Sequence, residues 1–372
     1  MDFIINGTPF QLKSINQEID ESFIKLYQSF LGNSSMNYEE FESIIHKYFD
    51  SINQLENKYE LHDDFFNHFI RLWNIILNNR NYGLGEWIWE KCIDISHSWE
   101  LNNENNFIHK GTPFYFWGMT AILRGDIDKG YSLMHKALQE DIRRYGTISP
   151  QTPSLAFAIS NYSESNQAFR NWSATQANYI KQLIDSYNQD LKCNFSLDEF
   201  WNKITGSNLD VSTIYQFFHY IAKFYDISRK PNYIYQGDFV SLLLLDLLFD
   251  LSRVVDAVLK KKNPSYWQMF NHIVILNTRM GIGLNQSYME QLNESYKPPN
   301  KFDEILASVL DDFFQFQDQT TMTLEGKSFA VAYGIRNHAA HNIEALPIIW
   351  ERYKEIEKYI FYALFLSIQK LY

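Results

Sequence analysis

A short run near the C-terminus, Tyr333 to Asn342, combines the side chains that catalysis at a phosphate requires. Arg336 carries a permanent charge on a planar fork of N–H donors, which matches the non-bridging oxygens of a phosphate group. His341 supplies an imidazole, the type of side chain best suited to proton transfer near neutral pH. Asn337 supplies an amide that would hold either the imidazole or the phosphate in register. These residue types predict acid–base chemistry on a phosphodiester.

The spacing within this run decides whether one helix can direct these groups at one substrate. Four residues turn about 400° in a helix, which places Asn337 and His341 on one face. Arg336 is about 140° away from His341 around the axis, so one helix is not expected to aim both at one phosphate. Two copies related by a twofold axis would pool two arginines and two histidines in one cleft. The spacing therefore predicts a homodimer.

Other polar residues are candidates for supporting roles. His338 is a second imidazole, which we expect to be a solvent-facing bystander rather than a participant. Asp246 and Asp250 fall on an apolar helix, where buried carboxylates would need partners, and one of them is a candidate for orienting Arg336. The basic residues expected on the rim of the cleft, where they would bind substrate, are Lys260, Lys261, Lys262 and Lys327.

Helical periodicity dominates the chain, and convincing alternating strands are absent from the sequence. With 15 Gly and 9 Pro among 372 residues, the turns of a barrel or sandwich are too few. We therefore predict an all-α fold, with a boundary near 205–212 between a region at 1–210 and a helical bundle at 211–372. The helices expected in the bundle cover 211–225, 239–262, 267–280, 302–316 and 324–341, followed by a last helix from Pro347 to Tyr372.

Residues 114–141 have the small residues of two closely packed helices. Gly118 lies on the first helix, Gly125 in the turn, and Gly130 and Ala137 on the second. This pattern resembles a tetratricopeptide repeat, and a weaker copy with Cys92 in place of Ala137 precedes it. The resemblance implies solenoid-like hairpins that bind a protein or ligand trigger; an ordinary helical bundle is the alternative.

The run from Arg336 to His341 resembles the Arg-x4-His signature of the HEPN superfamily. The resemblance covers roughly residues 212–372 and implies a bundle of four to five helices with the motif before the last one. It also implies metal-independent RNA cleavage by Arg336 and His341, usually across a dimer interface, in a bacterial defence or toxin setting. Asn337 matches the polar residue that often follows the arginine. The tyrosine that one toxin branch carries two residues after the histidine is replaced by Ile343.

Composition excludes several other classes of protein. A formal charge of -11 argues against a protein that coats nucleic acid without specificity. Most of this charge lies before residue 230, since residues 230–372 carry a net charge of only -2. Two cysteines make neither a disulfide framework nor a zinc site, so we expect no metal, no cofactor and a reducing cytoplasm. No secretory signal or membrane-spanning stretch is expected.

Two alternatives remain open from the sequence. Arg336 and His341 would be ordinary helix-end residues if they bonded carbonyl groups or paired with Glu344. The chain would then be a non-catalytic helical adaptor, whose bundle only dimerises or binds a nucleotide or RNA.

Residues His62 to Asp64 are expected to be a solvated helix start rather than a metal site.

Overall fold

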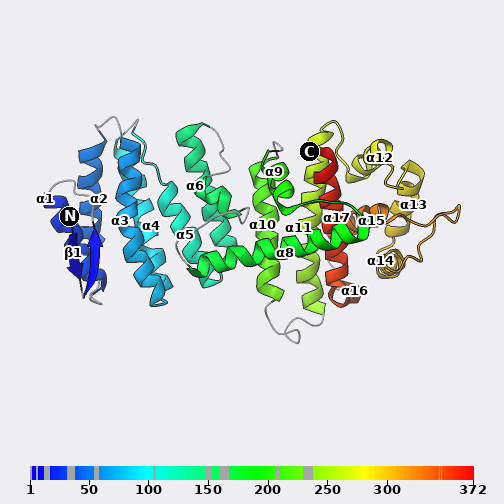
Figure 1. Ribbon diagram of the computed structural model, residues 1–372, viewed down its shortest axis with the longest axis horizontal. Helices are drawn as coiled ribbons and strands as arrows, with labels where there is room; N and C mark the ends of the chain where they lie inside the picture. The colour runs from blue at the N-terminus through cyan, green and yellow to red at the C-terminus, as the bar shows by residue number, and fades with distance from the viewer. Residues whose placement is uncertain are drawn as a thin grey trace. The chain divides into compact units, whose positions relative to one another are not determined.

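The computed structural model describes residues 2–5, 7–11, 17–31, 38–53, 58–103, 106–146, 152–158, 167–206, 209–228, 238–342, 344 and 346–372. They form two compact units, unit 1 (Met1–Phe157 with Tyr162–Arg170) and unit 2 (Ala158–Asn161 with Asn171–Tyr372). The fold is all-α (Figure 1), and strands in these described ranges are limited to one N-terminal hairpin and an isolated bridge. None of the described helices combines the length and apolar character that crossing a membrane requires.

Unit 1 consists of paired helices that follow a short hairpin. Its elements are β1 (Asp2–Ile5), β2 (Thr8–Gln11), α1 (Gln17–Leu31), α2 (Tyr38–Ile52), α3 (Lys58–Asn78), α4 (Tyr82–Asn102), α5 (Gly111–Arg124), α6 (Ile127–Tyr145) and α7 (Pro153–Ala158). The strands are antiparallel, and the stacked rings of Phe3 and Phe10 pack against Tyr27 of α1. The sequence did not predict this hairpin, because four-residue strands are too short to show a clear alternation.

The helices α5 and α6 meet in a close hairpin because both have a glycine at the contact. A side-chain carbon on Gly130 would lie 2.3 Å from Cγ1 of Ile122, and one on Gly118 would lie 2.9 Å from the carbonyl oxygen of Gly130. The turn between the helices is made by Gly125, whose φ of 101° favours glycine. The predicted pair of packed helices within 114–141 is therefore present.

The start of α3 differs from the sequence-based expectation. The helix begins at Lys58, so His62 lies within it and is fully buried rather than solvated. Its Nδ1 accepts a hydrogen bond from the backbone N–H of His109 at 3.2 Å. The expectation of a solvated helix start is wrong for His62, because His109, 47 positions further along the chain, covers this side of α3, whereas Asp63 and Asp64 are half-buried.

Unit 2 is a bundle around its last helix. Its elements are α8 (Gln167–Leu191), α9 (Leu197–Gly206), α10 (Val211–Ser228), α11 (Asp238–Lys262), α12 (Met269–Met280), α13 (Gln286–Tyr296), η2 (Pro299–Lys301), α14 (Phe302–Leu310), α15 (Leu324–His341), α16 (Pro347–Glu351) and α17 (Tyr353–Leu371). Most of α17, red in Figure 1, is buried, and it packs against α9, α11 and α15. The predicted last helix is interrupted at Arg352, which pairs with Asp311 at 2.8 Å and with Glu355 at 2.7 Å.

The division between the units lies within 158–171, not at 205–212. Most of α8 belongs to unit 2 because it packs with the last helix of the chain: Tyr179 donates to Glu357 of α17 at 2.5 Å. Glu357 also accepts from Tyr220 of α10 at 2.6 Å, and burial raises the pKa of this carboxyl to about 7. A buried polar cluster thus joins three helices that are far apart in the sequence.

Candidate functional site

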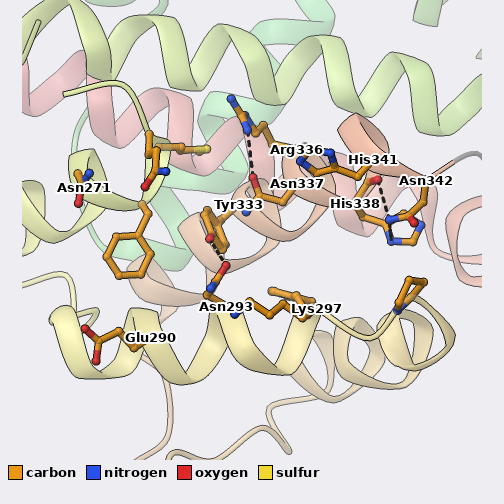
Figure 2. Close-up of a pocket in the computed structure, with 15 residues that line it drawn as sticks. Asn271, Glu290, Asn293, Lys297, Tyr333, Arg336, Asn337, His338, His341 and Asn342 are labelled. Carbon is orange, nitrogen blue, oxygen red and sulfur yellow. Dashed lines mark hydrogen bonds between the residues drawn. The ribbon is translucent and has the colours of Figure 1, made fainter.

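A cavity of about 690 Å³ lies in unit 2 between α15 and α13, beside the start of α12. Most of its lining side chains are amides, imidazoles or charged groups: Gln268, Met269, Phe270, Asn271, Glu290, Asn293, Tyr296, Lys297, Pro299, Tyr333, Arg336, Asn337, His338, His341 and Asn342. Figure 2 shows the residues of α15 facing those of α13 across this space. We call this cavity the cleft.

Two local features of the sequence place α15 along the cleft. Thr323 begins the helix, and its Oγ1 accepts a backbone N–H of the first turn at 3.0 Å. Gly334 allows α13 to approach, because a side-chain carbon there would lie 2.7 Å from Cζ of Tyr296. Tyr333 then donates to Oδ1 of Asn293 at 2.6 Å, a bond that joins the two walls (Figure 2).

Arg336 is held at the edge of the cleft by a carboxylate of α11. Its Nη2 lies 3.4 Å from Oδ2 of Asp256, and its Nη1 donates to Oδ1 of Asn337 at 3.1 Å. Burial raises the pKa of Asp256, although the charge of Arg336 opposes this shift. The guanidinium is only half-buried, so it can reach a substrate in the cleft while Asp256 fixes its position.

The carboxylates predicted to orient Arg336 lie elsewhere on α11. Asp246 is exposed, and Asp250 is half-buried with its Oδ1 3.5 Å from Nη1 of Arg253. Asp256 is six residues beyond Asp250, which turns it about 240° around the helix axis and onto the side that faces α15. The expectation that Asp246 or Asp250 is buried against Arg336 is therefore wrong.

The two histidines of the run have opposite environments. His341 is exposed at the end of α15 and borders the cleft. His338 is 4% exposed, stacks on Phe302 with ring centroids 4.0 Å apart, and has a pKa lowered by burial. Its Nε2 has no hydrogen-bond partner among the residues that the structure describes. The expectation of a solvent-facing His338 is wrong, because α14 covers this side of α15.

Arg336 and His341 border the same cleft within one chain. The helical spacing predicted that one helix would not aim both groups at a single phosphate, and sharing a cavity leaves that prediction untested. The cleft follows α15 for more than two turns, from Tyr333 to Asn342, so residues on different sides of its rim can both border it. The salt-bridge partner of Arg336 is Asp256, not Glu344.

Comparison with known proteins finds no relative of this chain. No protein-family model, curated protein or solved structure matches this chain. Ile343, which stands where one toxin branch of the HEPN superfamily carries a tyrosine, lies outside the described residues. Within the described part of the chain, no group of three or more His, Cys, Asp or Glu side chains is placed to hold a metal ion.

Lys327 does not contribute to the cleft. It lies in the first turn of α15, is buried, and its Nζ donates to the carbonyl oxygen of Leu310 at 2.5 Å and to Asp312 at 2.9 Å. The expectation that Lys327 binds substrate on the rim is therefore wrong, because the lysine instead closes the turn after α14.

Of the three lysines at the end of α11, Lys260 interacts with residues that adjoin the site. Its charge acts on Asp256, and its Nζ lies 4.7 Å from the ring centroid of Trp267. Trp267 is 80% exposed and directly precedes Gln268, a residue of the cleft. The other two lysines have partners elsewhere: Lys261 lies 3.5 Å from Asp210, and Lys262 lies over the ring of Tyr372.

Sequence reasoning missed the α13 wall and Asp256. The signal for α13 was present but weak, since its buried residues Met289, Leu292 and Tyr296 follow helical spacing in an otherwise polar segment. Asp256 has no comparable signal, because Asp246 and Asp250 are also aspartates on the apolar helix α11, and the sequence does not distinguish the three.

Proposed function

We propose that this protein is a metal-independent endoribonuclease of the HEPN type. The observation that carries the proposal is that Arg336, Asn337 and His341 border one polar cleft of a helical bundle. Lys297 lies on the opposite wall, where it pairs with Glu294, and the charge of Lys260 acts on Asp256; both are candidates to attract RNA phosphates. The amides of Asn293 and Asn342 offer further hydrogen bonds to a polar substrate.

The proposed reaction is transesterification within the RNA backbone. The ribose 2′-OH attacks the adjacent phosphorus, the bond from the 2′-oxygen to phosphorus forms, and the bond to the 5′-oxygen breaks. The products are a 2′,3′-cyclic phosphate and a 5′-OH. Arg336 stabilises the charge that develops on the non-bridging oxygens, and Asn337 orients the guanidinium through their hydrogen bond.

Proton transfer needs one imidazole that accepts the 2′-OH proton and one imidazolium that donates to the leaving 5′-oxygen. His341 is exposed to the cleft and suits either role, with a contribution of about 10²–10⁴-fold. His338 is buried, and its Nε2 is shielded from solvent, so it is a poorer candidate for this exchange. A homodimer that pools two copies of His341 would supply both groups, so dimerisation is part of the proposal.

The direct test is cleavage of a mixed-sequence RNA by the purified full chain in EDTA, with analysis of the product ends. We expect cyclic phosphate ends and a loss of at least about 100-fold in Arg336→Ala and in His341→Ala. His97→Ala, which removes an exposed imidazole from α4 of unit 1, is the matched control and should keep full activity. Uncut RNA, or full activity in His341→Ala, would contradict the proposal.

A defence or toxin role follows from the same resemblance. Expression of the wild-type chain should arrest bacterial growth, whereas expression of His341→Ala at the same level should not. Equal growth with both proteins, together with intact RNA, would instead favour the non-catalytic adaptor.

A further inference from the structure

A second cavity, of about 470 Å³, lies within unit 1 and takes no part in the proposed cleavage. Its walls come from α3, α5, α6 and α7. The volume is within the range of about 300–1,000 Å³ that small-molecule sites occupy. We call it the unit 1 cavity. Its polar wall and its apolar floor together specify the chemistry of a ligand.

The polar wall is organised by a buried histidine. His109 donates from Nδ1 to Asp63 at 2.8 Å and from Nε2 to Asp141 at 3.0 Å. Burial by itself would lower the pKa of His109, but the two carboxylates raise it to about 9, so the ring is charged at neutral pH. Because both N–H groups are occupied, His109 is neither a metal ligand nor a free proton donor in this arrangement.

The carboxylates of this wall are more accessible than its cations. The side chains of Asp63 and Asp141 are 29% and 16% exposed, whereas those of His109 and Arg144 are 4% and 11% exposed. Both oxygens of Asp63 and Oδ1 of Asp141 already pair with His109 or Arg144, so Oδ2 of Asp141 is the carboxylate oxygen that has no partner among the described residues. The surrounding field has the same sign, since residues 1–157 contain 13 Lys and Arg against 21 Asp and Glu.

An anionic ligand is the rival possibility, because the N-terminus of α5 also borders the cavity at Gly111 and Thr112. The protein places its own anion there. Oδ1 of Asp141 lies 3.0 Å from the position that a side-chain carbon on Gly111 would occupy, so the carboxylate sits against the first turn of α5. A bound anion would have to approach Asp141 closely, which like charges oppose.

The floor of the cavity is aromatic and aliphatic. Tyr115 and Phe116 are buried residues of α5, and Ile70 of α3 and Ala137 of α6 complete the apolar surface. Aromatic faces beside carboxylates are the surroundings that favour an organic cation, because the ring quadrupole and the carboxylate both attract positive charge. The aliphatic residues favour a hydrocarbon chain attached to that cation.

We propose that the unit 1 cavity binds an organic cation, a guanidinium or primary ammonium group on a short hydrocarbon chain. The charged group lies against Asp141 and Asp63, and the chain lies along Tyr115 and Phe116. A free amine and a basic side chain of a partner peptide carry the same chemistry. In either case unit 1 would sense its ligand at a site of its own, which is separate from the cleft.

The test compares three probes of the same length on the full chain by ligand-observed NMR: butylguanidinium, butylurea and butyrate. We expect butylguanidinium to bind with a Kd of roughly 1 mM, as its size allows, at least about tenfold more tightly than neutral butylurea. Butyrate should not bind. Equal binding of butylguanidinium and butylurea, or preferential binding of butyrate, would overturn the proposal.

A tripeptide Ala-Arg-Ala amide tests the peptide source: tighter binding than butylguanidinium indicates a partner chain, and no binding indicates a free amine.

Two variants locate the binding. Asp141→Asn should weaken butylguanidinium binding at least about fivefold, but it also loosens His109. Ile70→Trp fills the cavity without touching the charged wall and should abolish binding, while Leu101→Trp, at an exposed position of α4, should leave it unchanged. Unchanged binding in Ile70→Trp would overturn the assignment to this cavity. No RNA is present in these assays, so their failure would leave the nuclease proposal standing.

Discussion

The unit 1 cavity and the cleft of unit 2 use histidine in opposite ways. In unit 1, two carboxylates enclose His109, occupy both ring nitrogens and raise its pKa to about 9. In unit 2, burial against Phe302 lowers the pKa of His338, and His341 is left exposed at the end of its helix. The surroundings of an imidazole, rather than its presence, decide whether it serves as a structural cation, a neutral ring or a group open to substrate.

The arginines of the two sites differ in a similar way. Arg144 pairs with Asp63 and is largely buried beside His109, so its charge stabilises the wall of the unit 1 cavity. Arg336 pairs with Asp256 but remains half-buried at the edge of the cleft. An ion pair that leaves part of the guanidinium accessible can position the group and still offer it to a substrate. This comparison leads to three predictions.

The largest expected effect is a loss of stability in unit 1 at high pH. The pKa of His109 is raised from 6.5 to about 9, so its contribution to the free energy of unfolding is complete below pH 6.5 and is lost as the pH rises through 9. A shift of this size corresponds to about 3 kcal/mol. Urea unfolding at a series of pH values between 6 and 10, followed by tryptophan fluorescence, measures the slope of the free energy of unfolding against pH.

The control for this prediction is His109→Gln, which should be less stable at pH 7 and should lose the slope between pH 7 and 9. Glu357 does not account for that slope. Its folded-state pKa is raised from 4.5 to about 7, so its contribution is present below pH 4.5 and is lost as the pH rises through 7. The same slope in His109→Gln and in the wild type would contradict the assigned role of His109.

A smaller effect on the proposed RNA cleavage is expected from Asp256→Asn, because Asp256 pairs with Arg336 but does not line the cleft. We expect kcat to fall about tenfold, which corresponds to about 1.4 kcal/mol, with little change in KM. The matched control is Asp250→Asn on the same helix, which should retain wild-type kinetics since Asp250 faces Arg253 instead. If the two variants behave alike in steady-state cleavage assays, Asp256 has no positioning role.

The smallest effect is expected from Trp267→Ala, made together with His341→Ala so that the RNA stays intact. Trp267 is exposed, carries Lys260 over its ring and adjoins the cleft, so it suits stacking with an unpaired base. Affinity for a single-stranded oligonucleotide should fall about fivefold in a fluorescence anisotropy titration, within the range for one stacked base. Phe313→Ala, which removes another exposed ring of unit 2, should have no effect. A decrease of equal size in both variants would argue against specific stacking.

The sequence predicted most helices of unit 2, including the α15 wall of the site, but not its α13 wall. The range of α15, Leu324–His341, matches the prediction, because a capping threonine and a small-residue-rich apolar run mark the helix locally. The helix predicted over 302–316 ends at Leu310 instead. Asp312 adopts a φ of 61°, and the amides of Phe313 and Phe314 turn back to the carbonyl oxygen of Ser308. That turn and the polar helix α13 lack a strong hydrophobic period, so sequence patterns did not reveal them.

The sequence by itself determined the all-α class, the position of α15 and the presence of Arg336, Asn337 and His341 along it, since helical propensity and periodicity act over a few residues. Only the tertiary structure decided which aspartate pairs with Arg336, which histidine is buried and which carboxylates enclose His109. Those pairs join residues as far apart as Arg336 and Asp256, 80 positions away. Burial and pKa depend on such contacts between distant segments, and no local pattern specifies them.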